Sequence, residues 1–118
     1  MDEVEPKIAD NYAEIVQRCP MLTTLSIIGG KWKLAIVYQL HLSELLRFGE
    51  LRSRLPKITQ KMLTQQLREL EADQIVARKV YAEVPPRVEY SLTPRGESLR
   101  EVIQAMTAWG SERLSQKK

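Results

Sequence analysis

Residues 59 to 70 read Thr-Gln-Lys-Met-Leu-Thr-Gln-Gln-Leu-Arg-Glu-Leu, and as one helix they carry two opposed stripes. At about 100° per residue, Leu63, Leu67 and Leu70 share one side, which predicts a face that packs on a core. The opposite side is polar and holds Lys61, Thr64, Gln65 and Arg68. Amide, hydroxyl and cationic groups contact base edges and phosphates in a major groove. The segment is a candidate recognition helix, although ordinary surface helices share this pattern.

The flanking residues predict a helix-turn-helix followed by a hairpin. Pro56 forbids one continuous helix, so residues 48–55 are expected to form a separate short helix before a tight turn. Residues 75–82 and 88–92 are rich in β-branched and aromatic side chains and predict two strands. This order is that of a winged helix-turn-helix. We therefore expect a mainly α fold with a small β-hairpin wing.

Proline and glycine mark the remaining helices. After a first amphipathic helix that closes before Cys19, Pro20 opens a second helix, and Gly29-Gly30 end it. A third is expected to start at Lys31 and, being apolar nearly all round, to be buried on most sides. Thr93-Pro94 predict the start of one last helix. Its apolar stripe comprises Leu99, Val102, Ile103, Met106 and Trp109.

The length of that last stripe predicts a second copy of the chain. One small core does not easily cover it, so we expect a homodimer with the terminal helices at its interface. At 118 residues and 43% hydrophobic content, the chain is expected to form one domain over residues 1–118, with residues 1–7 frayed.

Charge favours a polyanionic partner. The whole chain carries only +3, but residues 47–68 hold six cations and one anion, a net charge of +5. A local cationic surface concentrates DNA and releases its counterions. One cysteine and one histidine provide neither a zinc ligand set nor a nucleophile with a base, so we expect no enzyme, no metal and no cofactor. Without a signal peptide or membrane span, a cytoplasmic location is expected.

The polar stripe contains the first candidate DNA contacts. Gln60 and Lys61 lie in the first turn of the predicted recognition helix, which reaches deepest into the major groove in this motif. Gln65 has the groups for a bidentate contact with adenine, and Arg68 for a guanine or a phosphate. Thr64 offers a hydroxyl or a methyl group to thymine.

Further candidates flank this helix. Arg87, in the loop of the hairpin, is a candidate for the minor groove, where a cation gains from the narrow groove's potential. Lys31, at a helix start, is a candidate for a phosphate. For both Arg87 and Lys31, an ordinary solvated cation is an equally good interpretation. Arg52 and Thr59 complete the predicted set of DNA contacts.

With these residues placed, the chain resembles the HxlR family of bacterial winged-helix transcription regulators over roughly Cys19 to Gly110. The matching pieces are Cys19-Pro20, Ile28-Gly29-Gly30-Lys31-Trp32, Arg47-Phe48, Glu50-Leu51-Arg52, Leu55-Pro56, residues 60–70, Pro85-Pro86-Arg87-Val88-Glu89-Tyr90, and Ser91-Leu92-Thr93-Pro94 with Gly96. The resemblance implies a homodimer that binds double-stranded operator DNA with two recognition helices.

The chain departs from the family's usual glycines or Gly-Pro at Glu44-Leu45, Lys57 and Gln74. Each departure removes a residue suited to positive φ or to a sharp bend. Gln74 follows the recognition helix, where a helix end commonly needs a left-handed residue. We expect these positions to affect local loop geometry and not the fold.

Cys19 is the candidate redox sensor. Its predicted place at a helix N-terminus beside Arg18 favours the thiolate. The resemblance implies a similar role, because the family contains members that sense oxidants or electrophiles with a cysteine here. The alternative is a small buried packing residue. As a sensor, this lone thiol needs a partner outside its own chain.

The expected function is a sequence-specific DNA-binding transcription regulator that acts as a homodimer on a pseudopalindromic operator. A response to oxidants or electrophiles through the single cysteine is part of this hypothesis. The alternative is a winged-helix module that binds proteins without sequence-specific DNA binding. No membrane partner is expected, and the residues identify no small-molecule effector.

Overall fold

The computed structural model describes residues 8–116 and the side chains from Tyr12 onward. These residues form two compact units, which divide after Gly30. The predicted fraying of residues 1–7 lies outside the described residues.

The first unit is a pair of helices, α1 (Ile8–Val16) and α2 (Pro20–Ile28). The hydroxyl of Thr23 donates to the carbonyl of Val16 and joins the two helices. The predicted limits of α2 are confirmed, because Cys19 is its N-cap and Gly29 its C-cap. Gly30 follows at φ 95°, a left-handed conformation that glycine adopts without strain.

The second unit is built around α3 (Lys33–Ser43). The predicted start at Lys31 is wrong by two residues, because Trp32 is the N-cap. The fully buried side chains of α3 are Ile36, Val37 and Leu40. Tyr38 and Leu42 are 44% and 60% exposed, so the expected burial on most sides is also wrong. α3 packs one face on the core and leaves apolar groups on the other.

The predicted helix-turn-helix is confirmed as α4 (Phe48–Ser53) and α5 (Gln60–Ala72). Glu50 accepts a hydrogen bond of 2.8 Å from the backbone N–H of Arg47 and so caps the start of α4. In the turn, Leu55 and Ile58 are each 5% exposed. Buried side chains on both sides of Pro56 hold the turn against the core.

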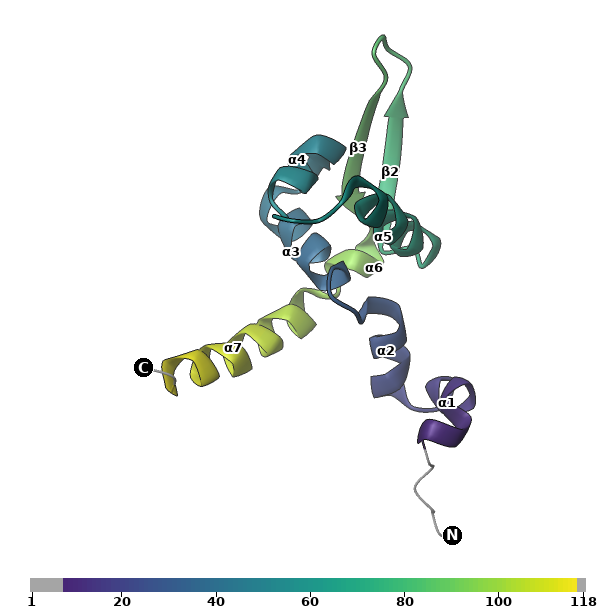
Figure 1. The fold of residues 1–118 in the computed structure, drawn as a ribbon, viewed down its shortest axis with the longest axis vertical. Helices are drawn as coiled ribbons and strands as arrows, with labels where there is room; N and C mark the ends of the chain where they lie inside the picture. Colours follow the sequence, from purple (N-terminus) through teal and green to yellow (C-terminus); the bar gives the residue numbers. More distant parts are fainter. Residues whose placement is uncertain (1–7, 117–118) are drawn as a thin grey trace. The chain divides into compact units, whose positions relative to one another are not determined.

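A three-stranded antiparallel sheet completes the winged fold, in the order β1-β3-β2. The hairpin strands β2 (Val76–Tyr81) and β3 (Arg87–Leu92) confirm the predicted wing. It extends beyond α4 and α5 (Figure 1). β1 (Leu45–Arg47) was not predicted, and it pairs with β3 through Leu46 and Tyr90, both buried.

The predicted last helix is two helices, α6 (Pro94–Glu97) and α7 (Arg100–Gln116), so the expectation of one was wrong. α6 is held against the start of β2. The hydroxyl of Thr93 caps α6 by accepting a hydrogen bond from the N–H of Gly96. The same hydroxyl donates to the carbonyl of Gln74 at 2.6 Å. A Cβ on Gly96 would lie 2.3 Å from the carbonyl oxygen of Ile75, so this close approach requires glycine.

The three departures from the family's glycines all have positive φ. Glu44, Lys57 and Gln74 have φ of 63°, 75° and 63°. A left-handed backbone conformation costs a residue other than glycine about 1 to 2 kcal/mol. The three positions therefore keep the left-handed backbone without glycine, so the expected change of local loop geometry is not seen, and the fold is unaffected as expected.

Candidate nucleic-acid interface

The start and the orientation of α5 are fixed by local contacts. Thr59 is the N-cap, and its Oγ1 accepts from the backbone N–H of Met62 at 3.0 Å. Such a cap stabilises a helix by about 1 kcal/mol. On the inner side of α5, Leu63, Leu67 and Leu70 are at most 2% exposed. These anchors turn the polar stripe outward.

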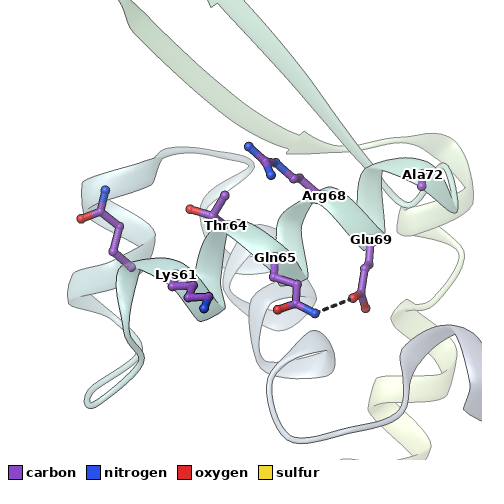
Figure 2. A pocket seen from close by; sticks show the side chains of 7 residues that line it. Lys61, Thr64, Gln65, Arg68, Glu69 and Ala72 are labelled. Carbon is purple, nitrogen blue, oxygen red and sulfur yellow. Dashed lines mark hydrogen bonds between the residues drawn. The ribbon is translucent and has the colours of Figure 1, made fainter.

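That outward side brings the predicted recognition residues together. Lys61, Gln65 and Arg68 are exposed, and Thr64 is half-buried. Figure 2 shows them along one side of the helix. They line an open hollow of about 760 Å³ together with Gln60, Glu69 and Ala72. The hollow offers donors, acceptors and two cations to a ligand that lies along the helix.

Glu69 borders this polar stripe and links it to the core. Its Oε1 lies 2.7 Å from Nζ of Lys33, whose side chain is only 11% exposed. Its Oε2 accepts a hydrogen bond of 3.2 Å from Nε2 of Gln65. The hydrogen bond from Lys33 and, next, that from Gln65 hold the pKa of Glu69 below its usual value of 4.5. Glu69 is therefore a carboxylate at neutral pH.

Lys33 and Glu69 were not among the predicted site residues. A signal for Lys33 was present, because it shares a side of α3 with Ile36, Val37 and Leu40 and so interrupts an apolar stripe. A lysine at such a position needs a partner in the fold. No local pattern indicates Glu69 as that partner, because the pair joins two helices.

Arg87 begins β3, where it pairs with Tyr81, and so does not lie at the tip of the hairpin. Its guanidinium lies 3.4 Å and 3.5 Å from the carboxylates of Glu83 and Glu89 and stacks 4.0 Å from the Tyr81 ring centroid. The Arg87 side chain is 29% exposed. A minor-groove contact therefore requires it to leave these partners, whereas Lys79 on β2 is already exposed.

Lys31 and Arg52 lie on other elements and do not line the hollow of α5. Lys31 is exposed before α3, with its Nζ 4.9 Å from the ring centroid of Trp32. Arg52 is exposed on α4. Lys31 remains a predicted phosphate contact and Arg52 a predicted DNA contact.

Cys19 belongs to the first unit. Its thiol is half-buried and makes no capping hydrogen bond to α2. It is the chain's single cysteine. A disulfide from Cys19 therefore requires a thiol of another molecule.

Two further observations concern the part of the chain that the structure describes. No three of its His, Cys, Asp and Glu side chains lie close enough together to hold a metal ion. None of the helices between Ile8 and Gln116 combines the length and the apolar character that a bilayer span requires.

Comparison with known proteins shows which family the fold resembles. Residues 27–118 match the HxlR-like helix-turn-helix family. YdeP of Bacillus subtilis (strain 168), an uncharacterised HTH-type transcriptional regulator, is 52% identical over 103 residues, which cover 87% of this chain and 80% of that protein.

Two solved structures are also similar. The redox regulator HypR in its oxidised form is 52% identical with a TM-score of 0.73, over 80% of this chain and 96% of that one. The reduced form of the transcriptional regulator YodB from B. subtilis is 39% identical with a TM-score of 0.70, over 80% of this chain and 92% of that one. The matches agree with the helix-turn-helix and the wing described above.

Proposed function

Because the chain belongs to the HxlR-like helix-turn-helix family of transcription regulators, we propose that it binds a pseudopalindromic operator as a homodimer. One α5 enters the major groove of each half-site, and the half-sites lie about one or two helical turns apart. The observation that carries this proposal is the exposed polar side of α5, which three buried leucines turn away from the core.

The proposed base contacts are those of the α5 hollow. Gln65 pairs with adenine, Arg68 with guanine or a phosphate, and Thr64 with thymine. Gln60 and Lys61, in the first turn, reach deepest into the groove. The proposed backbone contacts are Lys31, Arg52, Thr59 and, in the wing, Arg87.

The homodimer is supported by the apolar surface that α7 leaves uncovered. Met106, Trp109 and Leu114 are 54%, 73% and 66% exposed. Burying this surface against a second copy fits a symmetric operator, because each protomer then reads one half-site. We propose that residues 1–118 act as one DNA-binding domain in the cytoplasm, where a prokaryotic chromosome lies, and without catalysis.

Selection of binding sites from random DNA at two salt concentrations tests this proposal. We expect one pseudopalindromic site and an affinity that falls steeply with salt, because phosphate contacts release counterions. Arg68→Ala is expected to cost about 1 to 3 kcal/mol of specific binding. The matched control is Arg95→Ala, which removes an exposed cation from α6, outside the α5 hollow and the apolar face of α7, and is expected to leave the affinity unchanged.

Binding to DNA without any sequence preference would contradict the proposal of a specific operator. It would favour the alternative of a protein-interaction module, which neither the family nor the relatives support.

We also propose that Cys19 makes the regulator responsive to oxidants. The support is its half-buried thiol at the start of α2 and the similarity to HypR, a redox regulator. Two Cys19 thiols of different protomers lose two electrons and two protons to an oxidant such as diamide and form an intersubunit disulfide. Non-reducing electrophoresis and operator binding test this. Cys19→Ser is expected to abolish both the crosslink and the response, and an unchanged response in that variant would contradict the role.

A further inference from the structure

A chain of polar contacts runs from the core of the second unit to the outward side of α5. It begins at Lys33, which is 9% exposed and bonds to one oxygen of Glu69 at 2.7 Å. It continues from the other oxygen of Glu69 to the amide of Gln65 at 3.2 Å, one helical turn away (Figure 2). Each oxygen of this carboxylate thus has its own partner, one in the core and one on the polar stripe.

This chain fixes the orientation of the Gln65 side chain. A side-chain amide has a donor end and an acceptor end, whereas an ionised carboxylate only accepts. Lys33 and Gln65 hold the pKa of Glu69 low, so the carboxylate does not donate at neutral pH. The NH₂ group of Gln65 must therefore face Glu69. The carbonyl oxygen and the second N–H of Gln65 remain for a ligand.

The orientation matters for base recognition, because adenine presents an acceptor, N7, beside a donor, N6. A held amide whose oxygen and second N–H face these groups satisfies both. Guanine presents two acceptors, N7 and O6, so a held amide oxygen would meet an acceptor there. A freely rotating amide would turn its NH₂ group towards guanine. Restricting this rotation before binding also lowers the entropic cost of ordering the side chain.

We propose that Glu69 is a positioning residue for base recognition: anchored by Lys33, it holds the amide of Gln65 in the orientation that distinguishes adenine from guanine. This inference rests on the proposed function, in which Gln65 reads a base of the operator. Glu69 acts through Gln65 and does not itself contact the base pair.

The test measures the affinity of the purified chain for the selected operator, for each single base-pair substitution in one half-site, and for unrelated DNA. Gln65→Ala identifies the base pair that Gln65 reads, by an expected loss of about 5- to 100-fold in discrimination there. Glu69→Gln is expected to lose discrimination about fivefold or more at the same base pair. Its affinity for unrelated DNA is expected not to fall, because the substitution removes a negative charge.

Two further variants separate positioning from charge and from folding. Glu71→Gln makes the same charge change on the same helix at a carboxylate that pairs with Arg78 at 3.4 Å, and it is expected to keep the wild-type base preference. Lys33→Met removes the partner that anchors Glu69 from the core side. It is expected to change the base preference as Glu69→Gln does. Thermal unfolding of each variant shows that the protein used in the binding assay is folded.

The double variant Gln65→Ala with Glu69→Gln gives the decisive comparison. If Glu69 acts through Gln65, the second substitution changes nothing further once the amide is gone. A changed preference at a different base pair would overturn the positioning role, because Glu69 would then contact a base itself. A preference in Glu69→Gln equal to that of Glu71→Gln, or no loss of discrimination in Gln65→Ala, would overturn it too.

These results also separate the two proposals. A wild-type chain that prefers no site would overturn both the operator and the positioning role. A clear operator whose base preferences do not depend on Glu69 would overturn the positioning role alone.

Discussion

α5 and α7 carry comparable apolar stripes in the sequence, but only α5 buries its stripe within its own unit. Leu63 and Leu70 of α5 are 0% exposed, and Leu67 is 2% exposed. In α7 no side chain is buried, and Trp109 is 73% exposed. An amphipathic pattern thus predicts that a helix face will be covered, but it does not predict what covers it.

The two helices also differ in how they are held. α5 is capped by Thr59 and tied to α3 by the ion pair of Lys33 and Glu69. Figure 1 shows that α7 extends away from the sheet of its unit, so its far end has few neighbours there. We infer that α5 gets its position from the core of one chain, whereas α7 gets its full contacts only from a second copy.

The largest expected effect is on the buried stripe. Leu67→Ala is expected to lower the free energy of unfolding by about 2 to 5 kcal/mol, because it leaves a cavity under α5. Urea unfolding at a concentration where the chain is monomeric measures this. The matched change on α7, Met106→Ala, removes a half-exposed side chain and is expected to have a much smaller effect. Equal losses in the free energy of unfolding would contradict the inference that α5, and not α7, is held by the core of one chain.

The next effect is on association. Trp109→Lys is expected to weaken the proposed homodimer by about 2 kcal/mol or more, about 30-fold in its dissociation constant, because a charge replaces a large aromatic side chain on the proposed dimer face. Sedimentation over a range of concentrations measures it. Ser111→Lys adds the same charge on a different side of α7 and serves as the control. If Ser111→Lys alone dissociates the dimer, a different face of α7 forms the interface.

Local signals in the sequence predicted most of the fold. Pro56, Pro20 and Thr93-Pro94 marked the turn and two helix starts, because proline and capping residues act on their nearest neighbours. β1 was missed, since its three residues are stabilised by pairing with β3 far along the chain. The break between α6 and α7 was missed as well, because α6 is held by a contact distant in the sequence. The hydroxyl of Thr93, at the start of α6, donates to the carbonyl of Gln74, which follows α5.

The same limit applies to the site. The polar stripe of α5 follows from helix periodicity, so its residues were brought together as predicted. The ion pair of Lys33 and Glu69 depends on how α3 packs against α5, which no local pattern specifies. The stacking of Arg87 on Tyr81 likewise depends on the register of the hairpin, whereas Glu89 lies beside Arg87 because it is two residues further along the same strand. Which base each residue contacts remains a prediction.

A smaller effect concerns the end of α5, where the backbone is strained despite the good packing of the helix. Gln74 is exposed and has φ 63°, so Gln74→Gly relieves a left-handed L-residue and loses little buried surface. We expect a gain of about 1 kcal/mol in the free energy of unfolding, since the greater freedom of glycine in the unfolded chain offsets part of the relief. Chemical denaturation measures it. Asp73→Gly, at φ −85°, is the control and is expected to destabilise.

The smallest expected effect concerns the tie between α5 and α3, and it depends on pH. The pKa of Glu69 is lowered in the folded chain, chiefly by the hydrogen bond from Lys33, so its ionised form favours folding above the ordinary value of 4.5. As the pH falls below 4.5 and through the folded value, this contribution is lost. The stability difference between the wild type and Glu69→Gln should therefore shrink on acidification. Because the Glu69 side chain is 44% exposed, solvent screening keeps the effect small. Thermal unfolding from pH 7 to pH 3 measures it, with the Lys33→Met background as the control. Because the hydrogen bond from Gln65 also lowers the pKa of Glu69, a reduced pH dependence is expected to remain in that background, and an undiminished one would show that Lys33 is not the main cause.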